Sequence, residues 1–199
     1  MMSSETTRKP PRKRTIRQAQ LFEQLVALFL REGFAEMTLE AAAARLHCSK
    51  STIYSLASSR EQLVRKVVVF FFRVAAERVE GKLAGESSAG DRLAVYLRAV
   101  GDELRPASRA FINDVASFAP AHEVYERNID MTANRVRELI SEGMESGVFR
   151  QVHAVFVSEV VSSVMVSIQQ RRIADSTGLS DAEAYDALAA LVVDGIRVN

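Results

Sequence analysis

A short run of polar side chains beside a basic one has the clearest chemical potential in this sequence. Residues 49–54 read Ser-Lys-Ser-Thr-Ile-Tyr. Lys50 supplies positive charge, and Ser51 and Thr52 carry hydroxyls that reach base edges or phosphates when a helix lies in the major groove of duplex DNA. Ile53 is expected to face the protein core, and Tyr54 to place its hydroxyl on the DNA backbone. The pattern predicts a DNA-reading helix over about 49–55.

A second short helix, expected over 38–45, has to position the first. Thr38 and Ser49 are good N-caps, and only a tight turn around His47 and Cys48 separates the two helices. This arrangement is a helix-turn-helix. Thr38 and Ser49 would also be caps in a protein that never meets DNA, and Tyr54 would also suit a core.

The charge distribution points to the same end of the chain. Residues 1–60 hold 10 Lys or Arg against 5 Asp or Glu, whereas residues 61–199 hold 16 against 20. The segment 8–17 is rich in Arg and Lys, among them Arg12, Lys13 and Arg14, and suits the neutralisation of phosphates. Taken alone, a solvated and disordered arm over 1–14 is the simpler interpretation.

The rest of the chain predicts an all-α protein. Gly and Pro act as punctuation: Gly33 fits a C′ position, and Pro106 and Pro120 fit first turns of helices. No convincing strand pattern appears. Nine helices are expected, over about 15–32, 38–45, 49–55, 60–82, 89–104, 106–117, 120–146, 152–176 and 180–197.

Composition excludes several classes of protein. The single cysteine, Cys48, forms no intramolecular disulfide and no zinc cluster, which suits a reducing cytoplasm. The longest apolar runs fall short of the ~18 residues of a membrane span, and the basic N-terminus lacks the apolar core of a secretory signal. Phosphate-binding loops, zinc-protease motifs and a nucleophile elbow are missing, so we expect no enzyme, no cofactor and no metal.

Four segments also carry a family resemblance: 27–40, Ala42-Ala43, Ser49–Tyr54 and Arg60–Leu63. Together they resemble the DNA-binding domain of the TetR family of bacterial transcriptional regulators, continuously over about 20–65. The resemblance implies an all-helical homodimer with a DNA-binding domain over 15–59 and an effector-binding and dimerisation domain over 60–199.

The resemblance also implies roles for individual residues. Thr38 and Tyr54 would touch phosphates, Lys50, Ser51 and Thr52 would lie in the groove beside their cap Ser49, and Arg60 would stand where the family usually has Lys at the foot of the fourth helix. The sequence departs from the family pattern at His47, where Gly is frequent because the turn can require positive φ. It also has Ser55-Leu56-Ala57 where aromatic residues are usual.

The C-terminal part predicts a sensor and a dimer interface. The run 67–72 is apolar around most of the helix circumference, so we expect this helix to be enclosed and to transmit changes between domains. Candidate ligand-binding residues are Tyr96, Phe111, Phe118, His122, Tyr125, Asn128, Met131 and Met165, most of which would equally fit a plain core. Candidate dimer residues are Val157, Val161, Val164, Ile168, Leu188 and Val192, for which an intramolecular core is the alternative.

These observations together predict a cytoplasmic DNA-binding regulator. We expect a homodimeric repressor on a palindromic duplex operator, released by a small hydrophobic or amphipathic effector. A helical ligand-binding or interaction protein without DNA binding is the alternative, favoured by His47 and by residues 55–57.

Overall fold

The computed structural model describes residues 13–198, with side chains from residue 17 onward. The expected arm therefore falls largely outside the described residues, as do the side chains of Arg12, Lys13 and Arg14. Within residues 13–198 the protein is all-helical, as predicted, apart from an isolated bridge between Phe149 and Arg197. The helices are α1 (Lys13–Glu32), α2 (Leu39–Arg45), α3 (Lys50–Tyr54), α4 (Arg60–Leu83), α5 (Ala89–Leu104), α6 (Arg109–Ser117), α7 (Ala119–Glu145), α8 (Ala154–Gln169), α9 (Arg172–Thr177) and α10 (Asp181–Ile196).

The prediction of nine helices was wrong at one break. The expected helix over 152–176 is divided into α8 and α9 at Arg171, which has a left-handed backbone with φ 62°. Neither Gly nor Pro marks this position. Pro106 was also misplaced, because α6 begins at Arg109 behind Ser108, whose Oγ accepts from Phe111 N at 3.2 Å. Pro120 does lie in the first turn of α7, as expected.

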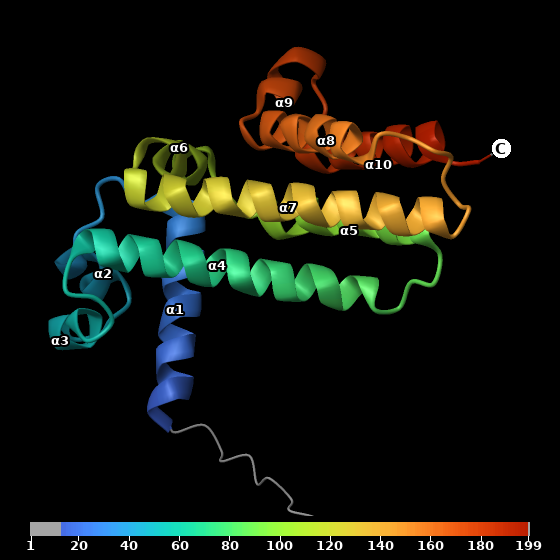
Figure 1. The fold of residues 1–199 in the computed structure, drawn as a ribbon. Helices are drawn as coiled ribbons and strands as arrows, with labels where there is room; N and C mark the ends of the chain where they lie inside the picture. Colours follow the sequence, from blue (N-terminus) through green and yellow to red (C-terminus); the bar gives the residue numbers. More distant parts are fainter. Residues whose placement is uncertain (1–12, 199) are drawn as a thin grey trace, which may run out of the picture.

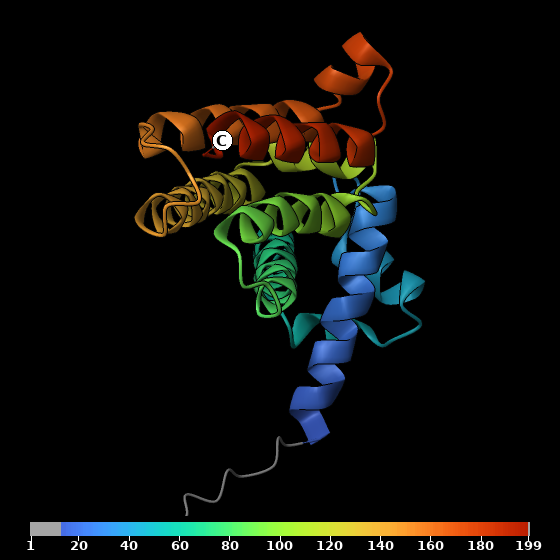
Figure 2. The same cartoon turned by 90° about the vertical axis from the view of Figure 1, so that its right-hand side faces the viewer.

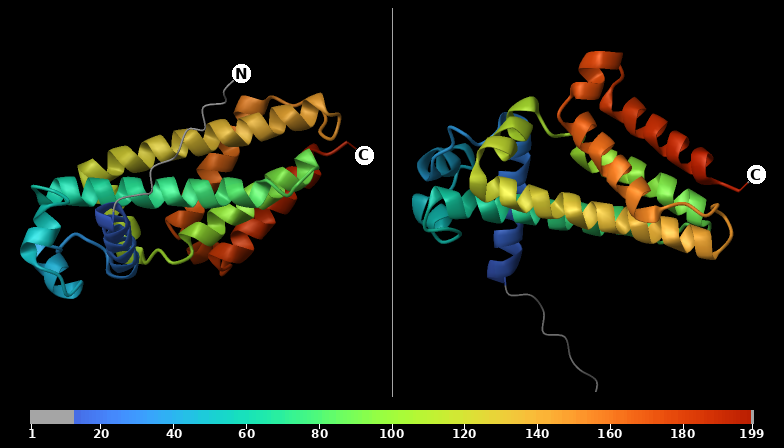
Figure 3. Two further views of the ribbon diagram at one scale, coloured as in Figure 1. Left: turned by 90° about the horizontal axis from the view of Figure 1, so that it is seen from below. Right: turned by 45° about the horizontal axis from the view of Figure 1, so that its top comes forward.

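The helices stack in layers. Figure 2 shows α8 and α10 as an outer layer, α5 and α7 beneath them, and α4 below, in agreement with the packing of α5 on α10, α7 on α8, and α4 on α5 and α7. Helix α1 crosses α4 and ends against α6 (Figure 1). Figure 3 shows α4 running the length of the molecule, with α2 and α3 at one end and the turn to α5 at the other.

Two buried clusters share α4. The first joins α1, α2 and α3 to Leu63–Phe72 of α4 and to residues of α6 and α7; the second joins the end of α4 to α5, α7, α8 and α10. The first core therefore extends beyond the expected boundary at residue 60. Helix α4 is not fully enclosed at 67–72 as expected, because Val69 points outward with 42% of its surface exposed.

A clamp on residues 33–37 joins the first three helices to the rest of the chain. Asp114 of α6 accepts hydrogen bonds from the backbone N–H groups of Phe34 and Ala35, the latter at 2.8 Å. Gly33 makes the close approach possible, since it has φ +76° and a Cβ there would lie 2.5 Å from Asp114 Oδ2. The amide of Ser108 also donates to Leu30 O at 2.7 Å. Helix α6 is thus fastened directly to the end of α1.

Replacing Asp114 with Ala is expected to lower the free energy of unfolding by about 1–3 kcal/mol, because two backbone donors lose a charged acceptor in a partly buried place. Urea unfolding followed by circular dichroism measures this change. Asn113→Ala, an exposed neighbour on α6, is the control and should stay within about 0.5 kcal/mol of the wild type. An Asp114→Ala protein as stable as that control would contradict the clamp.

Candidate nucleic-acid interface and effector cavity

Helix α3 is held by its apolar side and presents its polar side to solvent. Ile53 is fully buried in the first core, whereas Lys50 and Ser51 are exposed and Tyr54 is 47% exposed. The expectation that Ile53 faces inward is confirmed. The one-sided anchoring leaves the first residues of α3 accessible to a large partner.

Three hydroxyls gather at the start of α3. Ser49 Oγ lies 2.8 Å from Ser51 Oγ and 2.7 Å from Thr52 Oγ1, and it accepts from Thr52 N at 3.2 Å. Ser49 is therefore a structural cap, as is Thr38, whose Oγ1 accepts from Ala41 N at 3.0 Å. Each hydroxyl has one proton and two lone pairs, so this cluster retains capacity for base edges or phosphates.

Tyr54 is tied to a residue that the sequence analysis did not select. Its hydroxyl donates to Glu40 Oε1 of α2 at 2.9 Å. This hydrogen bond lowers the pKa of Glu40 and raises the pKa of Tyr54. The sequence did not indicate a functional role for Glu40, because an acidic residue in the first turn of a helix is ordinarily explained by its favourable interaction with the helix dipole.

The turn between α2 and α3 has the strained geometry that its position suggested. His47 has φ 49°, in the left-handed region where Gly is usual. Leu56 and Ala57, which replace the expected aromatic residues, are both buried and close the seam between α3 and α4. The two departures from the family pattern therefore leave the helix-turn-helix intact.

The structure gives Arg60 a different role from the DNA contact that the resemblance implied. Its guanidinium donates to the carbonyl oxygens of Phe34 at 2.9 Å, Ala35 at 2.5 Å and Met37 at 2.9 Å. It also lies 4.7 Å from the ring centroid of Phe118. With these partners Arg60 holds the segment 34–37 from the side opposite Asp114, and it is a structural cation rather than a free one.

A cavity of about 390 Å³ lies between α4, α5 and α7. Its apolar wall includes Phe72, Val79 and Leu104. Of the eight predicted ligand-binding residues, Tyr96, Asn128 and Met131 line it. The size and mixed character fit a site for a small organic molecule.

The other five predicted ligand-binding residues lie outside this lining. Phe111 and Met165 are buried in the two cores, and Phe118 packs on Phe34 and Arg60. His122 Nε2 lies 3.3 Å from Glu126 Oε1. Tyr125 donates to Gln169 Oε1 at 2.6 Å. These five are placed by packing and internal hydrogen bonds.

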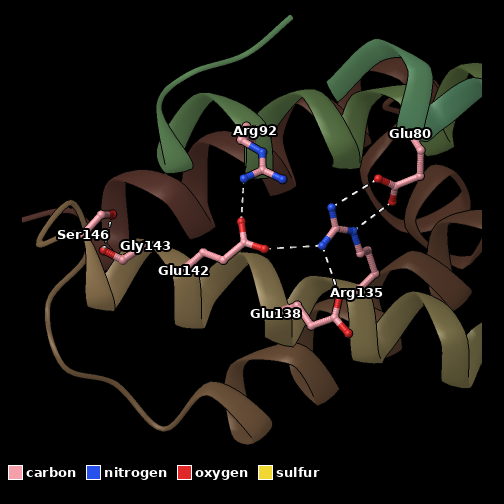
Figure 4. Close-up of polar contacts among 7 residues, drawn as sticks. All are labelled: Glu80, Arg92, Arg135, Glu138, Glu142, Gly143 and Ser146. Atoms are coloured by element: carbon pink, nitrogen blue, oxygen red, sulfur yellow. Dashed lines mark hydrogen bonds and ion pairs between the residues drawn. The ribbon is translucent and has the colours of Figure 1, made fainter. Parts of the chain in front are cut away.

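Charged residues missed by the sequence analysis line the cavity: Glu80, Glu103, Arg135 and Glu138. Arg135 donates to both carboxylate oxygens of Glu80, at 2.8 and 3.1 Å, and to Glu138 at 3.0 Å (Figure 4). Glu142 lies 3.5 Å away and bridges to Arg92 at 2.5 Å. The hydrogen bonds from Arg135 to Glu80 raise the pKa of Arg135. No spacing in the sequence marks these residues, because they come from three separate helices.

The predicted dimer residues divide between the inside and the surface. Val161, Ile168 and Leu188 are buried in the second core, which is the intramolecular packing that the sequence left open as the alternative. Val157, Val164 and Val192 are partly buried against the same core. The outer face of α8 and α10 instead exposes Val155, Phe156, Val160 and Leu191 at 45%, 66%, 44% and 74%.

Residues 13–198 contain neither a metal-binding cluster nor a membrane-spanning helix. No group of three or more His, Cys, Asp or Glu side chains in this range is arranged to hold a metal ion. No helix in it combines the length and apolar character that a membrane crossing requires.

Comparison with known proteins supports the fold. No family model matches the chain. An uncharacterized HTH-type transcriptional regulator, YfiR of Bacillus subtilis (strain 168), is 24% identical over 142 residues, which cover 68% of this chain and 69% of that protein. A putative transcriptional regulator from Saccharomonospora viridis, in complex with choline, superposes with a TM-score of 0.76 at 16% identity, covering 94% of this chain and 100% of that one.

A TetR-family transcriptional regulator from Cytophaga hutchinsonii superposes with a TM-score of 0.74 at 14% identity, covering 95% of this chain and 99% of that one. The likeness thus spans nearly the full length of both proteins, from the helix-turn-helix to the outer layer of α8 and α10. The chain has the fold of the TetR-family transcriptional regulators.

Proposed function

We propose that this protein is a DNA-binding transcriptional regulator that acts as a dimeric repressor and leaves its operator when a small molecule occupies the cavity between α4, α5 and α7. The observation that carries the DNA-binding part is the exposure of Lys50, Ser51 and Tyr54 on a helix anchored by the buried Ile53. A helix held in this way suits the major groove.

Contacts follow from the chemistry of each side chain. Lys50 neutralises a phosphate or reads a guanine edge, and Ser51 and Thr52 reach bases or phosphates with their hydroxyls. Tyr54 leaves Glu40 and donates its hydroxyl to a phosphate. Arg12 of the basic arm, with Lys13 and Arg14 at the start of α1, adds contacts to the adjacent minor groove.

The exposed apolar face of α8 and α10 supports a homodimer. Its exposed apolar side chains include Phe156, Val160 and Leu191. In a monomer these side chains would be in contact with water, which is unfavourable, whereas a second subunit would bury them. A twofold axis through this face would present two α3 helices to successive major grooves of a palindromic operator, about 34–36 Å apart.

Release requires that the effector favour one conformation over another. The cavity is lined by α4, which also belongs to the core of the DNA-reading end, so a tilt of α4 alters the spacing of the two α3 helices. Shifting the population from 1:99 to 99:1 needs a difference in binding free energy of about 5.5 kcal/mol. The choline complex of the Saccharomonospora viridis structure supports a small-molecule role for this fold.

Replacing Lys50 with Ala should weaken operator binding by about 1–3 kcal/mol for each half-site, since a groove or phosphate contact is lost. The duplex is first selected from a random pool, and affinity is then measured by fluorescence anisotropy over a range of salt. Lys82→Ala removes the same charge from the far end of α4 and is the control, expected to bind as the wild type does. A folded Lys50→Ala dimer with unchanged affinity would remove Lys50 from the interface.

Replacing Leu191 with Glu should dissociate the dimer. The change occurs twice across a twofold interface, so the cost is about 4 kcal/mol in total. Sedimentation equilibrium gives the dissociation constant. Val69→Glu, at an exposed apolar position on α4, is the matched control and should leave the association state unchanged. A Leu191→Glu protein that associates as tightly as the control would rule out this face.

A further inference from the structure

We propose that the cavity between α4, α5 and α7 selects an amphipathic ligand that carries a positive charge and discriminates against carboxylates. This inference rests on the proposed effector role of the cavity and adds the chemical class of its occupant.

Negative charge prevails in the lining. Glu80, Glu103 and Glu138 contribute three carboxylates, and Arg135 contributes the one guanidinium among the lining residues. A ligand that enters loses part of its hydration shell. Its electrostatic interaction with the lining is therefore stronger than it would be in water, because the dielectric constant is lower there. An ammonium group gains from this excess of carboxylates, and a carboxylate group is repelled by it.

Arg135 is not free to offset that repulsion. Each of its three guanidinium nitrogens has a carboxylate partner: Nε and Nη2 donate to Glu80 and Nη1 donates to Glu138, with Glu142 3.5 Å from Nη1 (Figure 4). Its side chain is only 21% exposed. An anionic ligand would have to break the two-pronged bond to Glu80 and leave that carboxylate without its partner, which costs more than a single new ion pair returns.

Glu103 differs from Arg135, because its ion-pair partner is exposed to solvent. Its side chain is 15% exposed, and its ion pair is a 3.3 Å contact with Arg78, whose own side chain is 62% exposed. This hydrogen bond reaches one carboxylate oxygen, Oε2, and comes from a side chain that lies largely in solvent, so the half-buried carboxylate is incompletely compensated. Of the lining carboxylates, Glu103 therefore gains most from a ligand cation.

The aromatic residues of the wall suit the same ligand. Phe72 and Tyr96 contribute aromatic rings to the lining. Aromatic rings attract cations as well as alkyl groups. Burial raises the pKa of Tyr96 to about 12, so its ring stays neutral and does not add to the charge of the site at physiological pH. Val79, Val100 and Leu104 complete an apolar surface for the ligand tail.

The experiment compares three probes with similar ten-carbon chains: decyltrimethylammonium and decanoate, each below its micelle-forming concentration, and decanol below its solubility limit. Isothermal titration calorimetry on the full chain measures their affinities in the absence of DNA. The ammonium probe is expected to bind at least about tenfold more tightly than decanoate, and decanol in between. Glu103→Gln should weaken binding of the ammonium probe by about tenfold and leave decanol unchanged.

Glu77→Gln is the matched control. Glu77 lies on α4, is 62% exposed and pairs with Arg73 outside the cavity, so its removal should change none of the three affinities. Glu138→Gln, which removes a lining carboxylate that is 59% exposed, gives a second variant whose ammonium affinity should also fall.

Three outcomes would overturn the inference: decanoate binding as tightly as the ammonium probe, both lining variants behaving like Glu77→Gln, or no saturable binding of the ammonium probe up to millimolar concentration. Operator affinity of the ligand-free protein is measured in parallel. Failure to bind any duplex would count against the proposed regulator, whereas the three outcomes above concern the charge of the ligand alone.

Discussion

The clamp on residues 33–37 is the constraint on which the rest of the structure depends. Asp114 takes the amide protons of this segment and Arg60 takes its carbonyl oxygens, so a short stretch of backbone is fixed from opposite sides. Both charges are satisfied by backbone dipoles, which gives directed contacts without a buried ion pair. Arg60 comes from α4 and Asp114 from α6. Residues 33–37 lead directly into α2 and α3, so both α4 and α6 help to fix the position of α3.

The same helices connect the cavity to the clamp. Helix α4 contributes Phe72, Val79 and Glu80 to the cavity and, about three to five turns earlier, Arg60 to the clamp. Under the proposed function, a ligand that displaced α4 would act on the hydrogen bonds to residues 34–37, and through them on α2 and α3. This continuity offers a physical path between the two ends, carried by one rigid element and one polar contact.

Local signals in the sequence were sufficient to predict the helix-turn-helix. They were not sufficient to predict which faces of helices far apart in the sequence pack against one another. Thr38, Ser49 and Pro120 marked helix starts through chemistry within a few residues of each. The cavity depended instead on which sides of α4, α5 and α7 face one another, so Glu103 and Arg135 looked like ordinary surface charges. The sequence of α8 likewise does not say that Val161 points inward and Phe156 outward. The break at Arg171 has no sequence marker, since neither Gly nor Pro occurs there.

The sharing of α4 between both buried clusters also bears on how the chain loses its structure. Val64 and Val68 belong to one cluster and Val79 and Leu83 to the other, within a single helix of 24 residues. Melting either cluster removes the packing that keeps half of this helix ordered, and a helix half without tertiary support is marginal in water. The two halves of the protein are thereby joined into one cooperative unit. A destabilising substitution in the cluster that contains α1, α2 and α3 therefore increases the rate of amide exchange in the cluster that contains α8 and α10.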